Sequence, residues 1–428
     1  MISIEIFADL DFLEKSILVG RLDYERIKGD ATYLFEFDKD FLGMFPGTVL
    51  SRDLGIFEGK QACGGQIFSF LGDALPDRWG RGLIDKRERI VAREKNRPPR
   101  HFNDFDYLVH LDDQTRMGAL RFYHDGILIN PAAYDKEVPI IADLKEITYE
   151  SLSYEKAVIE GKVPEDIWIN NLWAQGSSLG GARPKANIKD GDDIYIAKLP
   201  SVKDTYDVAL WEHFALTLAR KAGINSAQTR LLKLPTSDYH VLLSKRFDRN
   251  AGARVHYASS LTLTGLKDGD GFRTGKGYLD IVGAMISDVN VCEPMDNIRE
   301  LYRRIAFNIL IGNTDDHFRN HGFLLTKKGW TLSPAFDINP TTSLSHSLMI
   351  SESCNDSELS ELLAASESYL LERKEALNII EEVSDAVSSW RKTADEIGIS
   401  KAEQQRFAYR FDTQTKVGNS RSTLSDSD

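Results

Sequence analysis

The interpretation of this chain depends most on one polar stretch, Asn313-Thr314-Asp315-Asp316-His317-Phe318-Arg319-Asn320-His321-Gly322. Just before it, apolar side chains recur at helical spacing, namely Ile298, Leu301, Tyr302, Ile305, Ile309 and Leu310. Gly312 is a suitable residue to end that helix. Such a helix buries one face, so we expect the polar stretch to rest on a rigid support. Polar clusters are common in turns, but this concentration of carboxylates, histidines and asparagine favours an active site.

The spacing within and after this stretch predicts its chemistry. Asp315 and Asn320 have the same separation as the catalytic Asp and the metal-binding Asn in the protein-kinase loop H-R-D-L-x-x-x-N. Residues 322–326 and 330–336 alternate around a Lys-Lys-Gly turn, which predicts a β-hairpin. Asp337 ends the hairpin, where kinases place a second Mg²⁺-binding Asp. The pattern therefore predicts one base, Asp315, and two oxygen ligands for a hard cation, Asn320 and Asp337.

Composition narrows the class of protein. With 428 residues the chain can form two or three domains, and a net charge of −12 opposes bulk binding to nucleic acid. Cys63, Cys292 and Cys354 are scattered, which favours a reducing compartment over a disulfide framework. The N-terminus alternates like a strand, and no apolar run approaches membrane-spanning length. We expect a cytoplasmic protein that does not contact membranes.

A glycine-rich stretch lies earlier in the chain, at Gln175-Gly-Ser-Ser-Leu-Gly-Gly-Ala-Arg-Pro-Lys185. Small residues let backbone N–H groups approach phosphate oxygens, although a flexible surface loop has the same composition. Residues 193–199 alternate and place Lys198 on one strand face with Ile194 and Ile196. A lysine in that position needs a nearby anion, and kinases hold the α- and β-phosphates with such a lysine.

Two further segments extend this interpretation. Residues 205–222 are typical of a helix, and Glu212 falls on its apolar stripe. A buried glutamate needs a partner, for which Lys198 is the candidate; alternatively, Glu212 lies at the edge of the stripe and is solvated. Residues 239–244 predict a strand that leads into Lys245-Arg-Phe-Asp-Arg249, a segment that could contact adenine.

The remaining patterns outline the rest of the fold. Residues 1–50 predict strands, residues 357–365, 370–390 and 394–409 predict helices, and the Ser- and Asp-rich C-terminal end predicts disorder. The basic run at 86–100 is more typical of a solvated helix face than of a surface for nucleic acid or a partner.

Taken in order, these pieces resemble the HipA family, bacterial serine/threonine kinases that act as toxins of toxin–antitoxin modules. The resemblance rests on residues 178–185, 197–200, 245–249, 312–320 and 333–337, and in the N-terminal part on 75–81 and 117–122. It covers nearly the whole chain. It implies an α+β, two-lobed, kinase-like fold with a β-rich N-terminal module and a helical C-terminal lobe. The implied domains are a β-rich module at 1–125, a connecting segment at 126–168, a nucleotide-binding part at 169–248, a helical lobe at 249–415 and a disordered tail at 416–428.

The resemblance also implies a role for particular residues. Asp315 is the catalytic base, Asn320 and Asp337 hold Mg²⁺, and Glu212 forms the structural ion pair with Lys198. Ser178, or Ser177 beside it, is the autophosphorylated serine whose modification ejects the nucleotide loop and silences the kinase. The implied ATP-binding residues are Gly180, Gly181, Ala182, Arg183, Pro184, Lys185, Lys198, Lys245, Arg246, Phe247, His317, Asn320, Phe336 and Asp337.

The implied partners are a HipB-like helix-turn-helix antitoxin on a separate chain and a protein substrate, for which aminoacyl-tRNA synthetases are examples in the family. DNA would be reached only through the antitoxin. Two alternatives stay open from the residues. One is a metal-dependent hydrolase whose ligands are Asp315, Asp316, His317, His321 and Asp337. The other is a corepressor that binds a DNA-binding antitoxin and has no catalytic activity.

Overall fold

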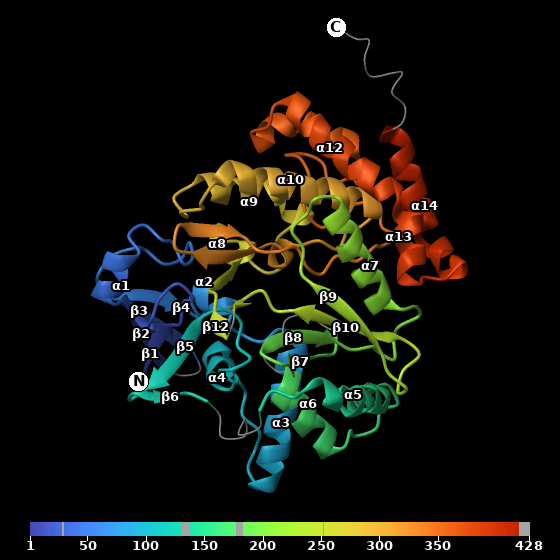
Figure 1. Cartoon of the computed structure of the whole chain (residues 1–428). Coiled ribbons are helices and arrows are strands. Elements are labelled where there is room, and N and C mark those ends of the chain that lie inside the picture. The colour runs from blue at the N-terminus through green and yellow to red at the C-terminus, as the bar shows by residue number, and fades with distance from the viewer. Residues whose placement is uncertain (28–29, 131–136, 177–182, 251, 419–428) are drawn as a thin grey trace. The chain divides into compact units, whose positions relative to one another are not determined.

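In the computed structural model of the chain, the described residues are 1–27, 30–130, 137–176, 183–250 and 252–418 (Figure 1). Helices and sheets are both present, which confirms the α+β prediction. The chain forms two compact units. Unit 1 consists of Met1–Ala209, Arg230–Ala258 and Leu324–Gly329, and unit 2 of Leu210–Thr229, Ser259–Phe323 and Trp330–Asp428. These units do not coincide with the predicted domain boundaries, because the chain passes between them several times.

The N-terminal sheet of unit 1 confirms the strands predicted from residues 1–50. Its strand order is β4-β3-β2-β1-β5-β6. Alternation along β1 buries Ile4, Ile6 and Ala8, and Phe35 on β3 packs against other aromatic rings. The strands are β1 (Ile2–Ala8), β2 (Ile17–Ile27), β3 (Asp30–Phe37), β4 (Gln61–Gly64), β5 (Leu120–His124) and β6 (Ile127–Leu128), with short helices α1 (Lys39–Met44) and α2 (Ser69–Gly72).

A second sheet of unit 1 has the order β7-β8-β10-β9. Its elements are β7 (Lys185–Asp190), β8 (Asp193–Lys198), β9 (Thr229–Lys233) and β10 (His240–Lys245). One apolar core joins this sheet to helices α3 (Arg78–Glu94), α4 (Asp104–Val109), α5 (Leu144–Ile159) and α6 (Asp166–Gly176). Leu144, Ile147 and Tyr154 of α5 belong to that core. The predicted connecting segment 126–168 therefore contributes a core helix.

The basic run at 86–100 is engaged within unit 1. Lys86 lies 4.4 Å from the centre of the Tyr154 ring, and Arg87 lies 5.4 Å from that of Trp173. Arg97 and Arg100 both bind the carboxylate of Glu88, which is 4 % exposed. The hydrogen bond from Arg97 is the main reason that the pKa of Glu88 falls to about 2. Lys86 and Arg87 thus pack α3 against α5 and α6, whereas Arg89, Arg93, Lys95 and Arg100 of the same run are exposed, as a solvated face predicts.

Helix α10 (Pro294–Ile311) is the central element of unit 2 and confirms the predicted helix before the polar stretch. Gly312 ends it at φ +72°, where a Cβ would lie 2.9 Å from Nε of Arg410 and 3.0 Å from the carbonyl oxygen of Thr341. A side chain there would collide with unit 2 itself. The other helices of this unit are α7 (Val208–Lys221), α8 (Ser260–Thr264), α9 (Tyr278–Ile286), α11 (Leu359–Ala364), α12 (Arg373–Ser388), α13 (Trp390–Ile397) and α14 (Lys401–Gly418).

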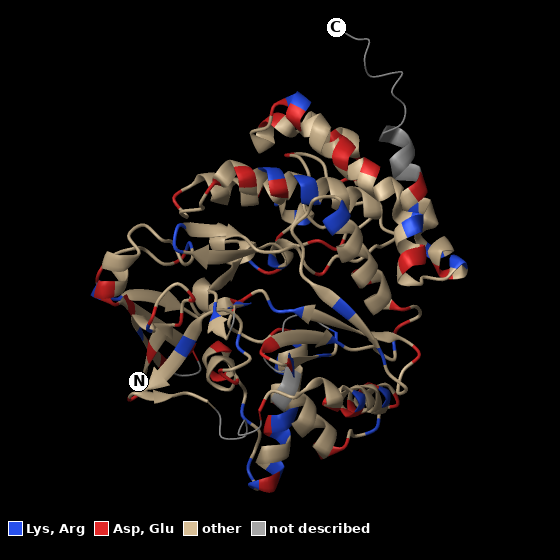
Figure 2. Ribbon diagram, viewed as in Figure 1, with Lys and Arg blue, Asp and Glu red and all other residues tan. Residues whose placement is uncertain are grey.

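The predicted hairpin after the polar stretch is also present, as β14 (Gly322–Thr326) and β15 (Gly329–Leu332), beside the short strand β13 (Tyr257–Ser259). Its second strand ends four residues earlier than predicted. Acidic and basic residues are interspersed along α10, α12 and α14 (Figure 2). Among the described helices, none combines the length and the apolar character needed to cross a bilayer. Most of the predicted disordered tail lies outside the described residues, and α14 reaches Gly418.

Candidate active site

The polar stretch leaves α10 as an extended loop whose side chains alternate between the core and solvent. Asp315 and His317 are exposed, whereas Asp316 between them is buried. His317 has extended backbone angles, φ −139° and ψ 168°, and a short 3-10 turn follows at Phe318–Asn320. Because successive side chains of an extended chain point to opposite sides, Asp315 and His317 share the solvent side. The buried side is anchored through Asp316.

Asp316 is the anchor of this loop. Its Oδ2 accepts hydrogen bonds from the Tyr278 hydroxyl at 2.7 Å, from Nδ2 of Asn308 at 2.9 Å and from Nε2 of His321 at 2.8 Å. Burial alone would raise the pKa of Asp316, but His321 and the hydroxyl of Tyr278 stabilise the carboxylate and lower it. Three separate elements thus converge on a single oxygen, and the loop has little freedom to move.

This anchoring contradicts the hydrolase alternative. That alternative used Asp316 and His321 as metal ligands, yet the two residues bind each other and both are buried. Within the described part of the chain, no group of three or more His, Cys, Asp and Glu side chains is arranged to hold a metal ion. Asp316 and His321 therefore belong to the hydrogen-bond network and are not free to act as metal ligands, whereas Asp315 and His317 face solvent.

A path of side-chain amides connects this anchor to Asp337. Asn308 accepts a hydrogen bond from Nδ2 of Asn313 at 3.1 Å, and Oδ1 of Asn313 accepts one from the backbone N–H of Asn339 at 3.2 Å. Nδ2 of Asn339 in turn donates to Oδ1 of Asp337 at 3.2 Å. Asp337 itself adopts φ +57°, a left-handed conformation that needs support from its surroundings. The network thus holds the segment of Asp337 against the polar loop.

The carboxylate of Asp315 has a raised pKa. Crowding by protein atoms is the largest cause, nearby His317 opposes it, and the negative charges of Asp337 and Asp316 add to it. Asp315 and Asp337 are therefore close enough to repel each other. Asn320, which is 8 % exposed, also belongs to this loop, and its Nδ2 lies 3.5 Å from the carbonyl oxygen of Asp315.

Asn320 and Asp337 fit a magnesium ion by two criteria. The side chains of Asn320 and Asp337 offer hard oxygen donors, which Mg²⁺ prefers. A cation would also relieve the repulsion between Asp315 and Asp337. Two protein ligands are few, but Mg²⁺ usually keeps several waters and binds phosphate oxygens of the substrate.

The predicted phosphate-binding residues lie on the second sheet of unit 1. Ala197 is buried in the core and Tyr195 packs against it, which confirms that Lys198 lies on the other face with Ile194 and Ile196. Lys185 on β7 is the direct cross-strand partner of Lys198. Like charges in directly opposite positions destabilise a sheet.

Other predicted ATP ligands are already engaged within unit 1. The guanidinium of Arg183 binds the carboxylate of Asp204 through two contacts, at 2.8 and 2.6 Å. Lys245 is paired with Asp193 at 2.7 Å and lies opposite Tyr195, on the core face of the sheet. The side chains of Lys245 and Lys198 therefore lie on opposite faces of the sheet, and the ATP contact of Lys245 stays a prediction.

The side chain of Arg246 is likewise engaged within unit 1. Its guanidinium donates to Asp248, to Oδ1 of Asn187 and to the carbonyl oxygens of Thr115 and Arg116. These contacts use all five N–H donors of the group, and the side chain is buried. The predicted contact of Arg246 with ATP can therefore involve only its backbone. Phe247, by contrast, lies near Tyr257, with ring centres 6.1 Å apart.

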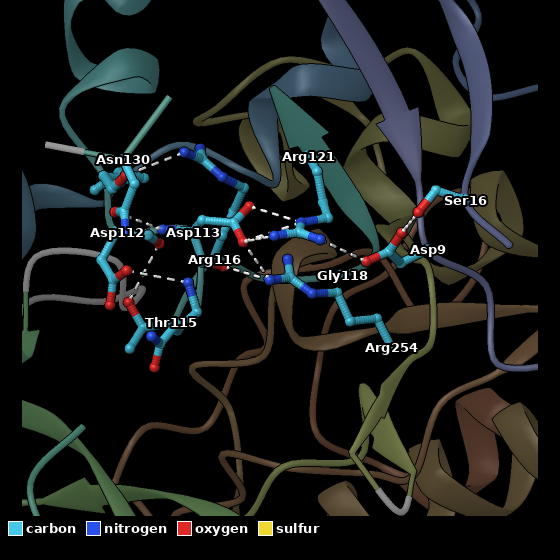
Figure 3. A network of polar contacts seen from close by, with 12 residues as sticks. Asp9, Ser16, Asp112, Asp113, Thr115, Arg116, Gly118, Arg121, Asn130 and Arg254 are labelled. Atoms are coloured by element: carbon cyan, nitrogen blue, oxygen red, sulfur yellow. Dashed lines mark hydrogen bonds and ion pairs between the residues drawn. The ribbon is translucent and has the colours of Figure 1, made fainter. Parts of the chain in front are cut away.

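These contacts form a joint that the sequence did not reveal. The carboxylate of Asp248 accepts a hydrogen bond from the backbone N–H of Gly118 at 2.8 Å, so the segments 112–118 and 246–249 are bound to each other. Beside it, Asp113 pairs with Arg121 and Arg254, and Arg121 reaches Asp9 (Figure 3). The only signal in the sequence was an excess of Arg and Asp in both segments, which does not identify the partners.

The roles of several residues remain predictions. Glu212 is buried at 3 % exposure, as its place on an apolar stripe predicted, but it belongs to unit 2 while Lys198 belongs to unit 1. The ion pair between them is therefore not tested. Pro184 is buried and Phe336, just before Asp337, is partly buried. Ser177, Ser178, Gly180, Gly181 and Ala182 lie outside the described residues.

Comparison with known proteins gives a family match over half of the chain. Residues 177–390 match the model of the HipA-like C-terminal domain. The serine/threonine-protein kinase toxin HipA of Shewanella oneidensis is 24% identical over 227 residues, which cover 47% of this chain and 52% of that protein. The putative kinase Y4dM of Sinorhizobium fredii is 28% identical over 159 residues, covering 34% of this chain and 37% of that protein. The chain thus spans about half or less of the curated relatives it matches.

One solved structure extends the likeness to nearly the whole chain. A chain of the Shewanella oneidensis complex of HipA, HipB and operator DNA superposes with a TM-score of 0.67, covering 98% of this chain and 97% of that one. The sequence identity is 17%, so this comparison establishes the fold alone.

Proposed function

The chain belongs to the HipA family, and on that premise we propose that it is a serine/threonine protein kinase that transfers the γ-phosphate of ATP to a hydroxyl group of a protein. The observation that carries this proposal is the loop in which a locked Asp316 presents Asp315 to solvent. A base held in this way can meet an incoming hydroxyl without first having to be ordered.

Asp315 would accept the proton of the acceptor hydroxyl as the new O–P bond forms. Phosphoryl transfer needs positioning and charge neutralisation more than covalent help, so a fixed carboxylate suits the task. Asn320 and Asp337 would hold Mg²⁺, which neutralises charge on the phosphate oxygens when bound. The amide path from Asn308 to Asn339 would keep Asp337 in place relative to Asp315.

On the nucleotide side, Lys198 and Lys185 would bind phosphate oxygens through their shared sheet face. From the resemblance we propose that the loop 180–185 covers the nucleotide and that Ser178, or Ser177, is the site of self-phosphorylation. The phosphate would add charge beside the nucleotide and weaken its binding.

The similar solved structure, a complex of HipA, HipB and operator DNA, supports a partner of the same kind for this chain. We infer that this chain also binds a HipB-like antitoxin on a separate chain and reaches DNA only through it. The net charge of −12 supports this, because it opposes direct binding to DNA. In this role the chain acts as a toxin in the cytoplasm and phosphorylates a protein substrate, for which aminoacyl-tRNA synthetases are examples in the family.

Radiolabelled ATP with the purified chain, wild type beside Asp315→Asn, tests the proposal. We expect the variant to lose label transfer by a factor of about 100 or more, since a general base contributes on that scale. Both proteins should gain the same Mg²⁺-dependent rise in melting temperature with ATP, because Asp315 is not a nucleotide ligand. Equal label transfer by the two proteins would refute the assignment of Asp315.

The corepressor alternative retains one specific support, the HipB–DNA complex of the similar structure. Expression of the Asp315→Asn variant in cells distinguishes the corepressor role from the kinase role. If repression depends only on complex formation, Asp315→Asn should repress the operon as well as the wild type, while toxicity is lost. Unchanged toxicity with the variant would favour a non-enzymatic role.

A further inference from the structure

A pocket of about 320 Å³ lies in unit 2 beside the polar loop. One wall is the loop Lys267–Arg273, and the other is formed by His317, Phe318, Arg319 and Ser347. His317 lies two residues after Asp315, on the same solvent side of the extended segment. The pocket therefore opens next to the proposed base, and none of the predicted nucleotide ligands other than His317 lines it.

The two walls of this pocket are bound to each other through Ser347. Its carbonyl oxygen accepts a hydrogen bond from the N–H of Phe272 at 2.9 Å, and its own N–H donates to the carbonyl oxygen of Thr314 at 3.0 Å. A Cβ on Gly271 would lie 2.4 Å from the carbonyl oxygen of Ser347. The close approach of the loop thus requires glycine, and the pocket is a fixed part of unit 2.

The charges in the pocket are unevenly neutralised. Asp268 is held by Arg319 through two contacts, at 2.8 and 2.6 Å, and Asp270 accepts a hydrogen bond from the backbone N–H of Lys267 at 2.8 Å. Lys267 and Arg273 are exposed, and neither forms an ion pair with any other residue in the described part of the chain. Three basic and two acidic residues line the pocket, so it carries a positive excess in a protein of net charge −12.

Phe272 adds an aromatic surface beside Arg273. Its side chain is 45% exposed, and the guanidinium of Arg273 lies 5.6 Å from the centre of its ring. An exposed ring beside one cationic side chain, in a pocket that a second exposed cation also lines, is suited to a polypeptide segment that carries an acidic side chain.

We propose that this pocket binds the segment of the protein substrate next to the acceptor Ser or Thr, and that Lys267 and Arg273 select an acidic side chain in that segment. The inference rests on the proposed kinase activity and adds the class of substrate to it. An acidic side chain seated here would place the neighbouring hydroxyl beside Asp315. Lys267, Phe272 and Arg273 are then specificity residues, and they take no part in ATP binding.

The test uses fluorescein-labelled peptides with a central Ser, in which flanking residues are Glu, Gln or Lys. Anisotropy measures binding, and label transfer from ATP measures phosphorylation, for the wild type and for Lys267→Glu/Arg273→Glu. Arg373→Glu/Lys374→Glu is the matched control, since it reverses two exposed charges on α12, outside the pocket. ATP with Mg²⁺ should raise the melting temperature of all three proteins equally.

We expect the wild type and the control to bind and phosphorylate the Glu peptide best. The pocket variant should bind it about tenfold more weakly, since each exposed ion pair contributes little and reversal adds repulsion. The pocket variant should also bind the Lys peptide more tightly than the wild type does. Equal preference for the Glu peptide in all three proteins, or no preference in the wild type, would overturn the inference. Glu-selective binding without label transfer would instead refute the kinase proposal on which the inference rests.

Discussion

At the scale of single residues, the adjacent acids Asp315 and Asp316 have opposite tasks. Asp315 is exposed and has a raised pKa, whereas Asp316 is buried, has a lowered pKa and accepts three hydrogen bonds on one oxygen. The extended backbone between them explains the difference, because it directs consecutive side chains to opposite sides. One residue is available for chemistry because the other fixes the loop.

Asp316→Asn should therefore destabilise the protein, while Asp315→Asn should not. The isosteric amide places a donor among the donors of Tyr278, Asn308 and His321, and we expect a loss of about 2–3 kcal/mol in the free energy of unfolding. The exposed Asp315→Asn should change it by less than about 0.5 kcal/mol. Urea denaturation of both variants measures this, and similar losses in the two would contradict the assigned roles.

His317→Gln should change the pH dependence of the reaction. The charge of His317 opposes the rise in the pKa of Asp315, so its removal should raise that pKa further. Asp315 would then be protonated up to a higher pH, and the acidic limb of kcat/KM against pH should move upward. His101→Gln, at an exposed position in unit 1, is the control and should leave the limb in place. A downward movement for His317→Gln would be inconsistent with this electrostatic role.

At the scale of elements, the joint between the segments 112–118 and 246–249 organises unit 1. Asp248 is fully buried, and although burial opposes its ionisation, Arg246 and Arg249 hold its pKa well below the usual range. Arg246 also donates to backbone carbonyl oxygens of the other segment. A buried charge cluster of this kind fixes geometry more than it adds stability, because desolvation offsets much of the attraction.

Removal of one charged residue of this joint should nevertheless destabilise the protein. Asp248→Ala leaves Arg246 and Arg249 buried without their carboxylate, and we expect a loss of about 3–5 kcal/mol in the free energy of unfolding. Asp193→Ala removes only the partly exposed pair with Lys245 and should cost less than about 1 kcal/mol. Hydrogen exchange at the amide of Gly118 should accelerate in the first variant alone. Equal stability losses in the two variants would show that the joint contributes no more to stability than the partly exposed ion pair does.

At the scale of the whole molecule, a buried histidine with a pKa of about 4 occurs in each unit. Burial lowers the pKa of His256 in unit 1 and of His346 in unit 2 to about 4, from 6.5. Both side chains are neutral in the folded protein near neutral pH. In the unfolded chain each would bind a proton below pH 6.5, so the unfolded state gains protons first as the pH falls.

The free energy of unfolding should therefore fall as the pH is lowered from about 6.5 to about 4. Each histidine contributes at most about 3 kcal/mol to that fall, since one unit of pKa corresponds to about 1.4 kcal/mol. His256→Gln and His346→Gln should each flatten the dependence, and the double variant should flatten it most. Urea denaturation across this pH range is the measurement, and an unchanged slope in the double variant would disprove the linkage.

The sequence by itself determined the elements whose signals are local. The apolar spacing before Gly312 predicted α10, the alternation of residues 193–199 predicted the face of Lys198, and the hairpin after Gly322 was predicted to within a few residues. Each of these depends on neighbours within one turn of helix or one pair of strands. The ordered motifs also indicated the HipA family, which the family match confirmed.

Only the tertiary structure decided which polar residues are structural. Asp316 and Tyr278 are 38 positions apart, and Asp248 and Gly118 are 130 apart, so no local pattern could pair them. The engagement of Arg246 was hidden for the same reason, because the carbonyl oxygens of Thr115 and Arg116 that it binds are 131 and 130 positions away. A residue type states which bonds a side chain can form. Which bonds it does form is fixed by the groups that folding brings within about 3 Å of it.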